Sequence, residues 1–136
     1  MPDKTLTILI AAVVVLSAAH DLDHLLRDDF SRPSSWTIAR LFLFVKYALT
    51  GAALYFYFRG SLGAKFWSAV GAAGAALLWF AHLRAGSDQR PADIYAKYAD
   101  PAAGAAAAGV VYALMAALLA LAVYGAWRSA TRRASG

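Results

Sequence analysis

The sequence of 136 residues contains neither cysteine nor glutamate. The absence of cysteine excludes disulfides, thiolate metal ligands, iron–sulfur clusters and cysteine nucleophiles. The absence of glutamate leaves any carboxylate chemistry to the eight aspartates. Only 15% of the residues are charged and 61% are hydrophobic, a balance that soluble domains of this size rarely have. The composition therefore predicts a membrane protein.

Several sequence motifs of soluble enzymes are also absent. The chain has no Gly-x-x-x-x-Gly-Lys phosphate loop, no Gly-x-Ser-x-Gly nucleophile elbow and no His-Glu-x-x-His zinc motif. The formal net charge is +5, but the basic residues are scattered at the ends of hydrophobic segments and do not alternate with aromatic residues. Such residues suit lipid head groups, so membrane lipid is expected as a partner and nucleic acid is not.

Four stretches have the roughly twenty mostly apolar residues that a membrane-spanning helix needs. They cover about residues 5–26, 36–58, 64–83 and 102–127. Short connections between them predict one all-α domain over residues 1–136, an integral membrane antiparallel four-helix bundle. Pro91 suits the first turn of a helix, which predicts a short surface helix over 92–98 in the third connection. The weak basic start of the chain favours a retained first helix over a cleaved signal peptide.

Small residues are concentrated in the third and fourth hydrophobic stretches. In lipid, such residues let helix backbones approach closely, because van der Waals packing replaces the hydrophobic effect there. These two spans are therefore expected to pack against each other or against a second copy of the chain. The alternative is an alanine-rich composition without a special interface. The residues concerned are Gly71, Ala72, Gly74, Ala75, Ala76, Gly104, Ala108 and Gly109.

Charge is distributed unevenly between the two ends of the predicted bundle. One end carries seven of the eight aspartates, namely Asp21, Asp23, Asp28, Asp29, Asp88, Asp93 and Asp100. The other end carries both termini, the turn at 59–65, and the basic residues Lys4, Arg59, Lys65, Arg128, Arg132 and Arg133. The positive-inside rule therefore predicts that both termini are cytoplasmic, in a bacterial inner membrane.

All three histidines are expected at the aspartate-rich end. His20 and His24 are four residues apart, so they stack on one face of a helix with Asp23 beside them, whereas Asp21 points elsewhere. His82 closes the third hydrophobic stretch, which places it at the same depth. The three imidazoles predict a metal site, with Asp23 or Asp88 completing the shell or orienting a ring.

This donor set suits zinc, iron or copper. Zinc with a bound water would support hydrolysis of a lipid-like ester or amide, with an aspartate such as Asp23 as the base, and iron would point to oxidation of a lipid-soluble substrate. Alternatively, the histidines and aspartates are simply solvated at a helix end.

Two basic residues lie inside the second hydrophobic stretch. Lys46 is ten residues after Trp36, about 15 Å along a helix, and so lies near the bilayer centre. A lysine there is costly unless it is paired, deprotonated or able to extend to the interface, so it marks function by default. Lys46 is expected to tune the site or to pair with Asp21 or Asp23. Arg40 would hold an anionic group.

Two other functions remain open at this point. His20 or His24 together with His82, on two helices at matched depth, could ligate haem b, with Arg40 near a propionate, as in an electron-transfer subunit. The chain could instead be a non-catalytic transporter or an accessory subunit of a larger membrane complex, with the 84–101 connection docking the partner. A homo-oligomer is a further alternative.

Overall fold

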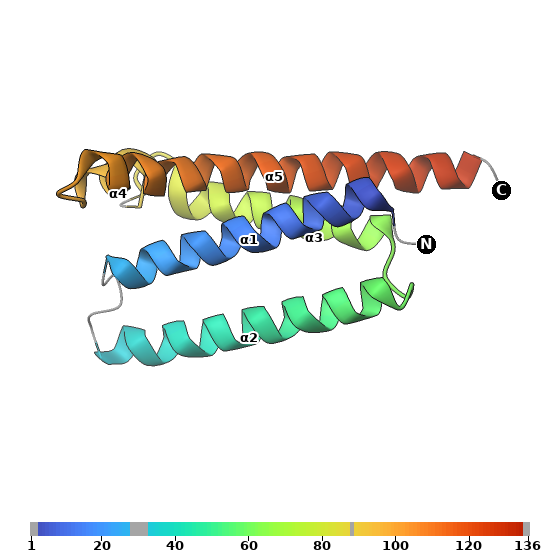
Figure 1. Cartoon of the computed structure of the whole chain (residues 1–136), viewed down its shortest axis with the longest axis horizontal. Coiled ribbons are helices and arrows are strands. Elements are labelled where there is room, and N and C mark those ends of the chain that lie inside the picture. Colours follow the sequence, from blue (N-terminus) through green and yellow to red (C-terminus); the bar gives the residue numbers. More distant parts are fainter. Residues whose placement is uncertain (1–2, 28–32, 88, 135–136) are drawn as a thin grey trace.

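A computed structural model of the chain is all-helical, and it describes residues 3–27, 33–87 and 89–134, with backbone alone for 33–39 and 132–134. Four long helices run antiparallel along one axis (Figure 1): α1 (Lys4–Leu26), α2 (Pro33–Phe58), α3 (Ala64–Leu78) and α5 (Pro101–Ala134). A π-helical turn, η1 (Trp79–Leu83), continues α3, and the short helix α4 (Pro91–Ala96) precedes α5. The predicted four-helix fold with a short helix in the third connection is confirmed.

The four long segments are long and apolar enough to cross a membrane, over Lys4–Leu26, Arg40–Phe58, Ala64–Leu83 and Pro101–Thr131. The third segment includes η1, so the π turn belongs to the apolar span. Large apolar side chains such as Leu41, Phe44 and Val123 are exposed on these helices, as expected for surfaces that lipid covers. The structure does not describe the side chains of Trp36, from which the depth of Lys46 was counted, or of Arg132 and Arg133, which contributed to the predicted orientation.

Helices α3 and α5 form the tightest interface of the bundle. A Cβ atom added to Gly71 would lie 2.7 Å from both the backbone nitrogen of Ala122 and the carbonyl oxygen of Leu118. A Cβ atom added to Gly125 of α5 would lie equally close to the carbonyl oxygen of Ala64. The expected packing of these two spans is therefore confirmed. Gly109, which the sequence also suggested, has no described residue within 4 Å of its added Cβ and takes no part.

The substitution Gly71→Ala is expected to destabilise the bundle by about 1–3 kcal/mol, because the new methyl group meets backbone atoms that cannot rotate away. The matched control is Gly109→Ala, whose methyl group enters open space among the described residues. The measurement is the unfolding free energy of each variant in mixed micelles of a mild detergent and dodecyl sulfate. Equal stability of the two variants would contradict the close α3–α5 contact.

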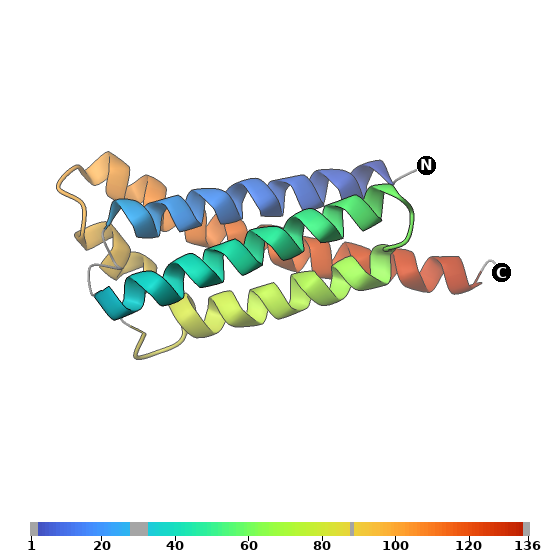
Figure 2. The same ribbon diagram turned by 90° about the horizontal axis from the view of Figure 1, so that it is seen from below.

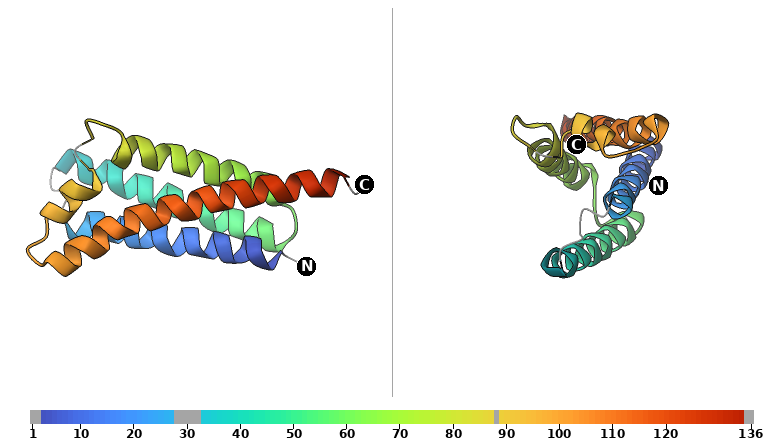
Figure 3. Two further views of the ribbon diagram at one scale, coloured as in Figure 1. Left: turned by 90° about the horizontal axis from the view of Figure 1, so that it is seen from above. Right: turned by 90° about the vertical axis from the view of Figure 1, so that its left-hand side faces the viewer.

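Helix α2 stands apart from the other three long helices. Seen end-on (Figure 3, right), α3, α5 and α1 lie next to one another in an arc, and α2 lies below it. In the view from below (Figure 2), α2 is therefore the helix in front. Near its end, Tyr57 packs with Leu6, Ile10 and Trp67 in an apolar cluster. Further towards its start, the described contacts between α2 and α1 are polar and involve Asp21. Helix α2 is therefore held at two separated points.

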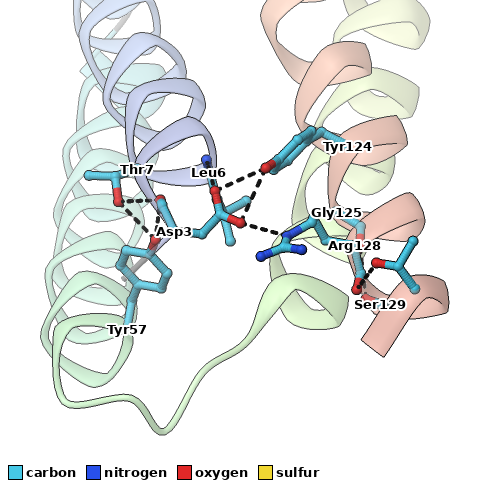
Figure 4. A network of polar contacts seen from close by, with 9 residues as sticks. Asp3, Leu6, Thr7, Tyr57, Tyr124, Gly125, Arg128 and Ser129 are labelled. Carbon is cyan, nitrogen blue, oxygen red and sulfur yellow. Dashed lines mark hydrogen bonds and ion pairs between the residues drawn. The ribbon is translucent and has the colours of Figure 1, made fainter. Parts of the chain in front are cut away.

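Asp3 fastens three helices at the end of the bundle that carries the termini (Figure 4). Its carboxylate caps α1 by accepting a hydrogen bond from the backbone N–H of Leu6 at 3.1 Å. The same carboxylate accepts hydrogen bonds from Arg128 Nε at 2.7 Å and from the Tyr124 hydroxyl at 3.0 Å, both on α5. Its backbone carbonyl accepts a hydrogen bond from the Tyr57 hydroxyl of α2 at 3.3 Å. These hydrogen bonds of Asp3 join α1, α2 and α5 at the end that carries the termini, and together they are called the Asp3 clamp.

Because of the Asp3 clamp, the stability of the fold is expected to decrease at acidic pH. The Leu6 backbone N–H, and then Arg128 and Tyr124, hold the pKa of Asp3 below its ordinary value of 3.8 against the opposing effect of burial. A lowered pKa in the folded state contributes stability above the unfolded value, and this contribution is lost as the pH falls through the folded value. Asp3→Asn keeps a side chain that can cap the helix but loses the charge opposite Arg128, so we expect it to cost up to about 1 kcal/mol at pH 7 and to weaken the acid dependence below about pH 4. Unfolding measured against pH checks both, and an unaltered acid profile in the variant would contradict the clamp.

Candidate metal centre

The three histidines converge at the opposite end of the bundle from Asp3. His20 and His24 occupy successive turns of α1, and His82 lies in η1. The ring centroid of His20 lies 4.7 Å from the centroids of both His24 and His82, and the centroids of His24 and His82 are 5.6 Å apart. One ligand nitrogen from each ring lies within 4.8 Å of the others. The predicted placement of the three histidines at one depth is confirmed, and the structure adds that their rings meet there, in a group that could hold a metal ion.

Local helix geometry explains why His82 faces inward. The buried face of α3 recurs at steps of three and four residues, through Gly71, Ala75 and Leu78, and four residues further along is His82. In the π turn, the backbone N–H of Arg84 bonds the carbonyl of Trp79 at 2.9 Å. π turns are rare in proteins, and those that occur within α-helices are often found at functional sites.

The end of η1 is closed by side chains. The Ser87 hydroxyl donates to the carbonyl of Ala81 at 2.5 Å, and Arg84 Nε donates to the carbonyl of Phe80 at 3.0 Å. These bonds satisfy carbonyls that have lost their helical partners. His82 therefore sits in a turn whose end is firmly defined.

Burial and hydrogen bonding select the nitrogens that face the centre. His20 and His82 are only 7% and 4% exposed, and His24 is half-buried. His82 Nδ1 lies 2.7 Å from the carbonyl of Gln89, and because a carbonyl only accepts, Nδ1 carries the proton and Nε2 is left for an ion. His20 Nδ1 is buried without a hydrogen-bond partner among the described residues. An orphaned buried nitrogen is costly, and an ion would satisfy it.

Asp23 lies beside the cluster, and its carboxylate is already engaged. Its Oδ2 accepts from Arg27 Nε at 2.9 Å and lies 2.8 Å from Arg27 Nη2, and its Oδ1 accepts from the Tyr98 hydroxyl at 2.6 Å. Arg27 Nη2 is in turn 3.3 Å from His24 Nδ1. The group of converging ligand atoms consists of the three histidines without Asp23. Both oxygens of the Asp23 carboxylate are thus occupied by Arg27 and Tyr98, which argues against Asp23 as a metal ligand.

Lys46 and Arg40, the predicted basic residues of the second span, are placed differently. Lys46 Nζ lies 2.6 Å from Asp21 Oδ2, which also accepts from the Tyr47 hydroxyl at 2.6 Å. The expected pairing of Lys46 is thus confirmed for Asp21, and Asp23 has other partners. Arg40 is exposed on α2. Asp28, Asp29 and Asp88 lie outside the described residues, so the role of Asp88 as a ligand stays a prediction.

Two residues beside the centre, Gln89 and Tyr98, were not predicted from the sequence. Both belong to the long third connection, and they flank α4 on either side. Gln89 contributes its carbonyl to His82 and its side-chain Oε1 to Arg27 Nη1, at 3.1 Å. The sequence offered only a general indication, because a long polar connection next to a predicted site often contributes residues to that site.

The arrangement offers three imidazole rings, a buried position and a hydrogen bond that leaves His82 Nε2 free for an ion. Such a donor set can hold one divalent ion and leave a coordination position open. Comparison of the chain with protein-family models, with curated proteins and with solved structures finds no match.

Proposed function

We propose that this chain is a metal-dependent membrane protein that holds one divalent ion between His20, His24 and His82. The observation that carries the proposal is the convergence of three ligand nitrogens to within 4.8 Å. Three nitrogen ligands with an open fourth position form the donor set of many catalytic zinc sites, and iron and copper accept the same set. The sequence offers no thiolate to compete.

The cluster needs only a small adjustment to hold an ion. Nitrogens bound to zinc at about 2.0–2.1 Å in a tetrahedral site lie about 3.3 Å from one another. The largest separation here is 4.8 Å, so the rings must approach by about 1.5 Å. Rotation of the imidazoles and a small shift of the π turn towards α1 are sufficient for that.

The position of the cluster in two membrane-spanning segments favours a substrate that dissolves in the membrane. His24 is the least buried of the three rings, so the open position lies on its side of the centre. Zinc would supply a water of lowered pKa for hydrolysis of a lipid-like ester or amide, and iron would use dioxygen as the oxidant of a lipid-soluble substrate. Asp23 would lie outside the ligand set and hold Arg27, Lys46 would neutralise Asp21 beside His20, and Arg40 would hold an anionic head group. His24 Nδ1 accepts from Arg27, so this contact must give way when His24 binds the ion.

Ring geometry favours an ion over haem b, the alternative that the sequence left open. The rings of His20 and His82 meet edge to face at 4.7 Å, and His24 packs against both. A haem between two axial imidazoles would have to separate these rings and displace the third. A single ion fits between all three.

Orientation and partners are part of the proposal. We place both termini in the cytoplasm of a bacterial cell and the metal centre at the opposite side of the inner membrane, on the distribution of basic residues. A non-catalytic role, as a transporter or as an accessory subunit of a larger complex, would use the same site to bind or move the ion. Reporter fusions at the two termini test the orientation.

Titration with Co²⁺ tests the proposed function directly. The protein is purified through a histidine-free tag, in detergent, without chelator. We expect one equivalent of Co²⁺ to bind, with visible absorption bands of nitrogen coordination, and Zn²⁺ to displace it. A protein that binds neither ion would overturn the proposal, and a Soret band in the purified protein would establish haem instead.

A further inference from the structure

A long apolar groove lies on the surface of the bundle, between α3 and α5. These two helices are closest at Gly71 and Gly125 and separate from each other towards η1 (Figure 3, left). The groove extends along residues 72–83 of α3 and η1 and along residues 115–122 of α5. Its volume is about 480 Å³, and all eight residues that line it are apolar. The groove therefore has the size of a small-molecule site but carries no charge of its own.

The groove has the depth of one membrane leaflet. It ends at Leu83, which is also the last residue of the third apolar span, Ala64–Leu83. The helical rise gives the stretch from Ala72 to Leu83 a length of about 16 Å. The hydrocarbon region of a bilayer is about 30 Å thick, so the groove runs from one edge of that region to about its middle. One acyl chain of a phospholipid covers the same depth.

Hydrocarbon is the medium next to this groove, because both segments that form it are long and apolar enough to span a membrane. An empty groove would deprive its lining atoms of dispersion contacts, and a flexible acyl chain can fill an irregular space of this length. Trp79 and Leu119 line the groove and are 55% and 50% exposed, so each has a surface left for a chain to cover. The apolar part of the occupant is therefore an acyl chain.

A cation lies at the end of the groove that meets the membrane surface. Arg84 follows Leu83 directly and is exposed. Its Nε donates to the carbonyl of Phe80 at 3.0 Å, and its guanidinium carbon lies 4.1 Å from the centre of the Phe80 ring. The Phe80 side chain is itself exposed, so both contacts hold the guanidinium on the lipid-facing side of η1.

The guanidinium of Arg84 has hydrogen-bond donors that no described residue uses. Among the described residues Arg84 has no ion pair, and the nearest described carboxylate in sequence, Asp93, pairs with Arg90 at 2.9 Å. Its two Nη groups can therefore donate to the oxygens of a phosphate, for which the planar guanidinium is well shaped. The charge at the end of the groove thus favours an anionic head group.

We propose that the groove between α3 and α5 binds one anionic glycerophospholipid, with an acyl chain along the groove and the phosphate at Arg84. In a zwitterionic phospholipid the ammonium group offsets the phosphate, so Arg84 favours the anionic class. The three histidines take no part in this site, so the proposal stands whether or not they hold an ion.

Native mass spectrometry of the detergent-purified protein, mixed with equal amounts of phosphatidylglycerol and phosphatidylcholine, tests the site. We expect one phosphatidylglycerol to remain bound to the original protein. Ala76→Leu places a larger side chain in the groove and should lose the bound lipid, whereas Ala73→Leu, exposed on α3 outside the groove, is the matched control. Arg84→Gln should lower the preference for phosphatidylglycerol about 5-fold. Arg59→Gln, which removes an exposed arginine beside the Tyr55 ring at the other end of the bundle, should leave that preference unchanged.

Three results would overturn the proposal. If the original protein retains no lipid, or retains both lipids equally, it has no site for an anionic phospholipid. Equal retention by Ala76→Leu and Ala73→Leu would place the lipid elsewhere on the protein. A lipid-free dimer that Ala76→Leu converts to a monomer would show that a second copy of the chain covers the groove. Should Ala76→Leu not fold, Ala72→Leu, at another exposed position that lines the groove, takes its place.

Discussion

Replacement of His82 by alanine is expected to remove high-affinity metal binding. The substitution takes away one of three ligand nitrogens, and the sequence contains no other histidine and no cysteine to replace it. The loss should exceed the about 10–100-fold that removal of an outer partner costs. The dissociation constants for Zn²⁺ and Co²⁺, measured by titration of the detergent-purified protein, provide the check.

The matched control for His82→Ala is Asp93→Asn. Asp93 belongs to α4, close to the site in sequence, and pairs with Arg90 at 2.9 Å on the exposed surface. This variant alters a carboxylate without touching the cluster, so its affinity should equal that of the original protein. If His82→Ala also retains the original affinity, the ion is held elsewhere and the three-histidine site is excluded.

Loss of the Lys46 ammonium is expected to destabilise the bundle by about 3–5 kcal/mol, because it leaves a carboxylate unpaired inside a membrane-spanning segment. Lys46→Met keeps the length of the side chain and removes the charge that lies 2.6 Å from Asp21 Oδ2. The Tyr47 hydroxyl remains as the one other hydrogen bond to that oxygen among the described residues. Unfolding in mixed micelles measures the cost.

A double-mutant cycle isolates the ion pair from the general effect of removing a lysine. The double variant Asp21→Asn with Lys46→Met should recover much of the stability, because no unpaired charge remains. Lys65→Met, at an exposed position near the turn between α2 and α3, is the control and should have little effect. Additive single effects, or equal stability of Lys46→Met and Lys65→Met, would contradict a buried ion pair.

Hydropathy and connection length were sufficient to predict the spans, because a membrane requires about twenty apolar residues per helix. The common depth of the three histidines followed from the same constraint, whereas the meeting of their rings did not. Antiparallel helices of equal length bring the end of the first and the end of the third to one level. The predicted packing of α3 with α5 followed from glycines and alanines, and Gly71, Gly74 and Ala75 of α3 pack against α5.

The neighbours of the other helices were not predictable from apolar patterns. Lipid is as apolar as leucine, so hydrophobicity does not distinguish a helix face that meets another helix from one that meets lipid. The structure places α5 against both α1 and α3, and leaves α2 attached to α1 through Asp21 and Tyr57. The π turn that carries His82 also depends on tertiary packing, and no local pattern predicts it.

One feature of the centre was visible in the sequence and was not used. Asp23 and Arg27 are four residues apart on one helix, a spacing at which opposite charges pair. That spacing indicates an engaged carboxylate and argues against Asp23 as a metal ligand. Gln89, in contrast, is 62 residues from its partner Arg27, and Tyr98 is 75 residues from its partner Asp23. Contacts between residues so far apart in the chain could be found only in the folded structure.

X-ray absorption of the zinc-loaded protein tests the central proposal most directly, because it counts the ligands of the ion. The proposed centre predicts three imidazole nitrogens at about 2.0–2.1 Å, a light fourth ligand and no sulfur. The same measurement on His82→Ala should show fewer imidazoles or no stoichiometric zinc. A spectrum of oxygen ligands alone in the original protein would contradict a metal centre built from His20, His24 and His82.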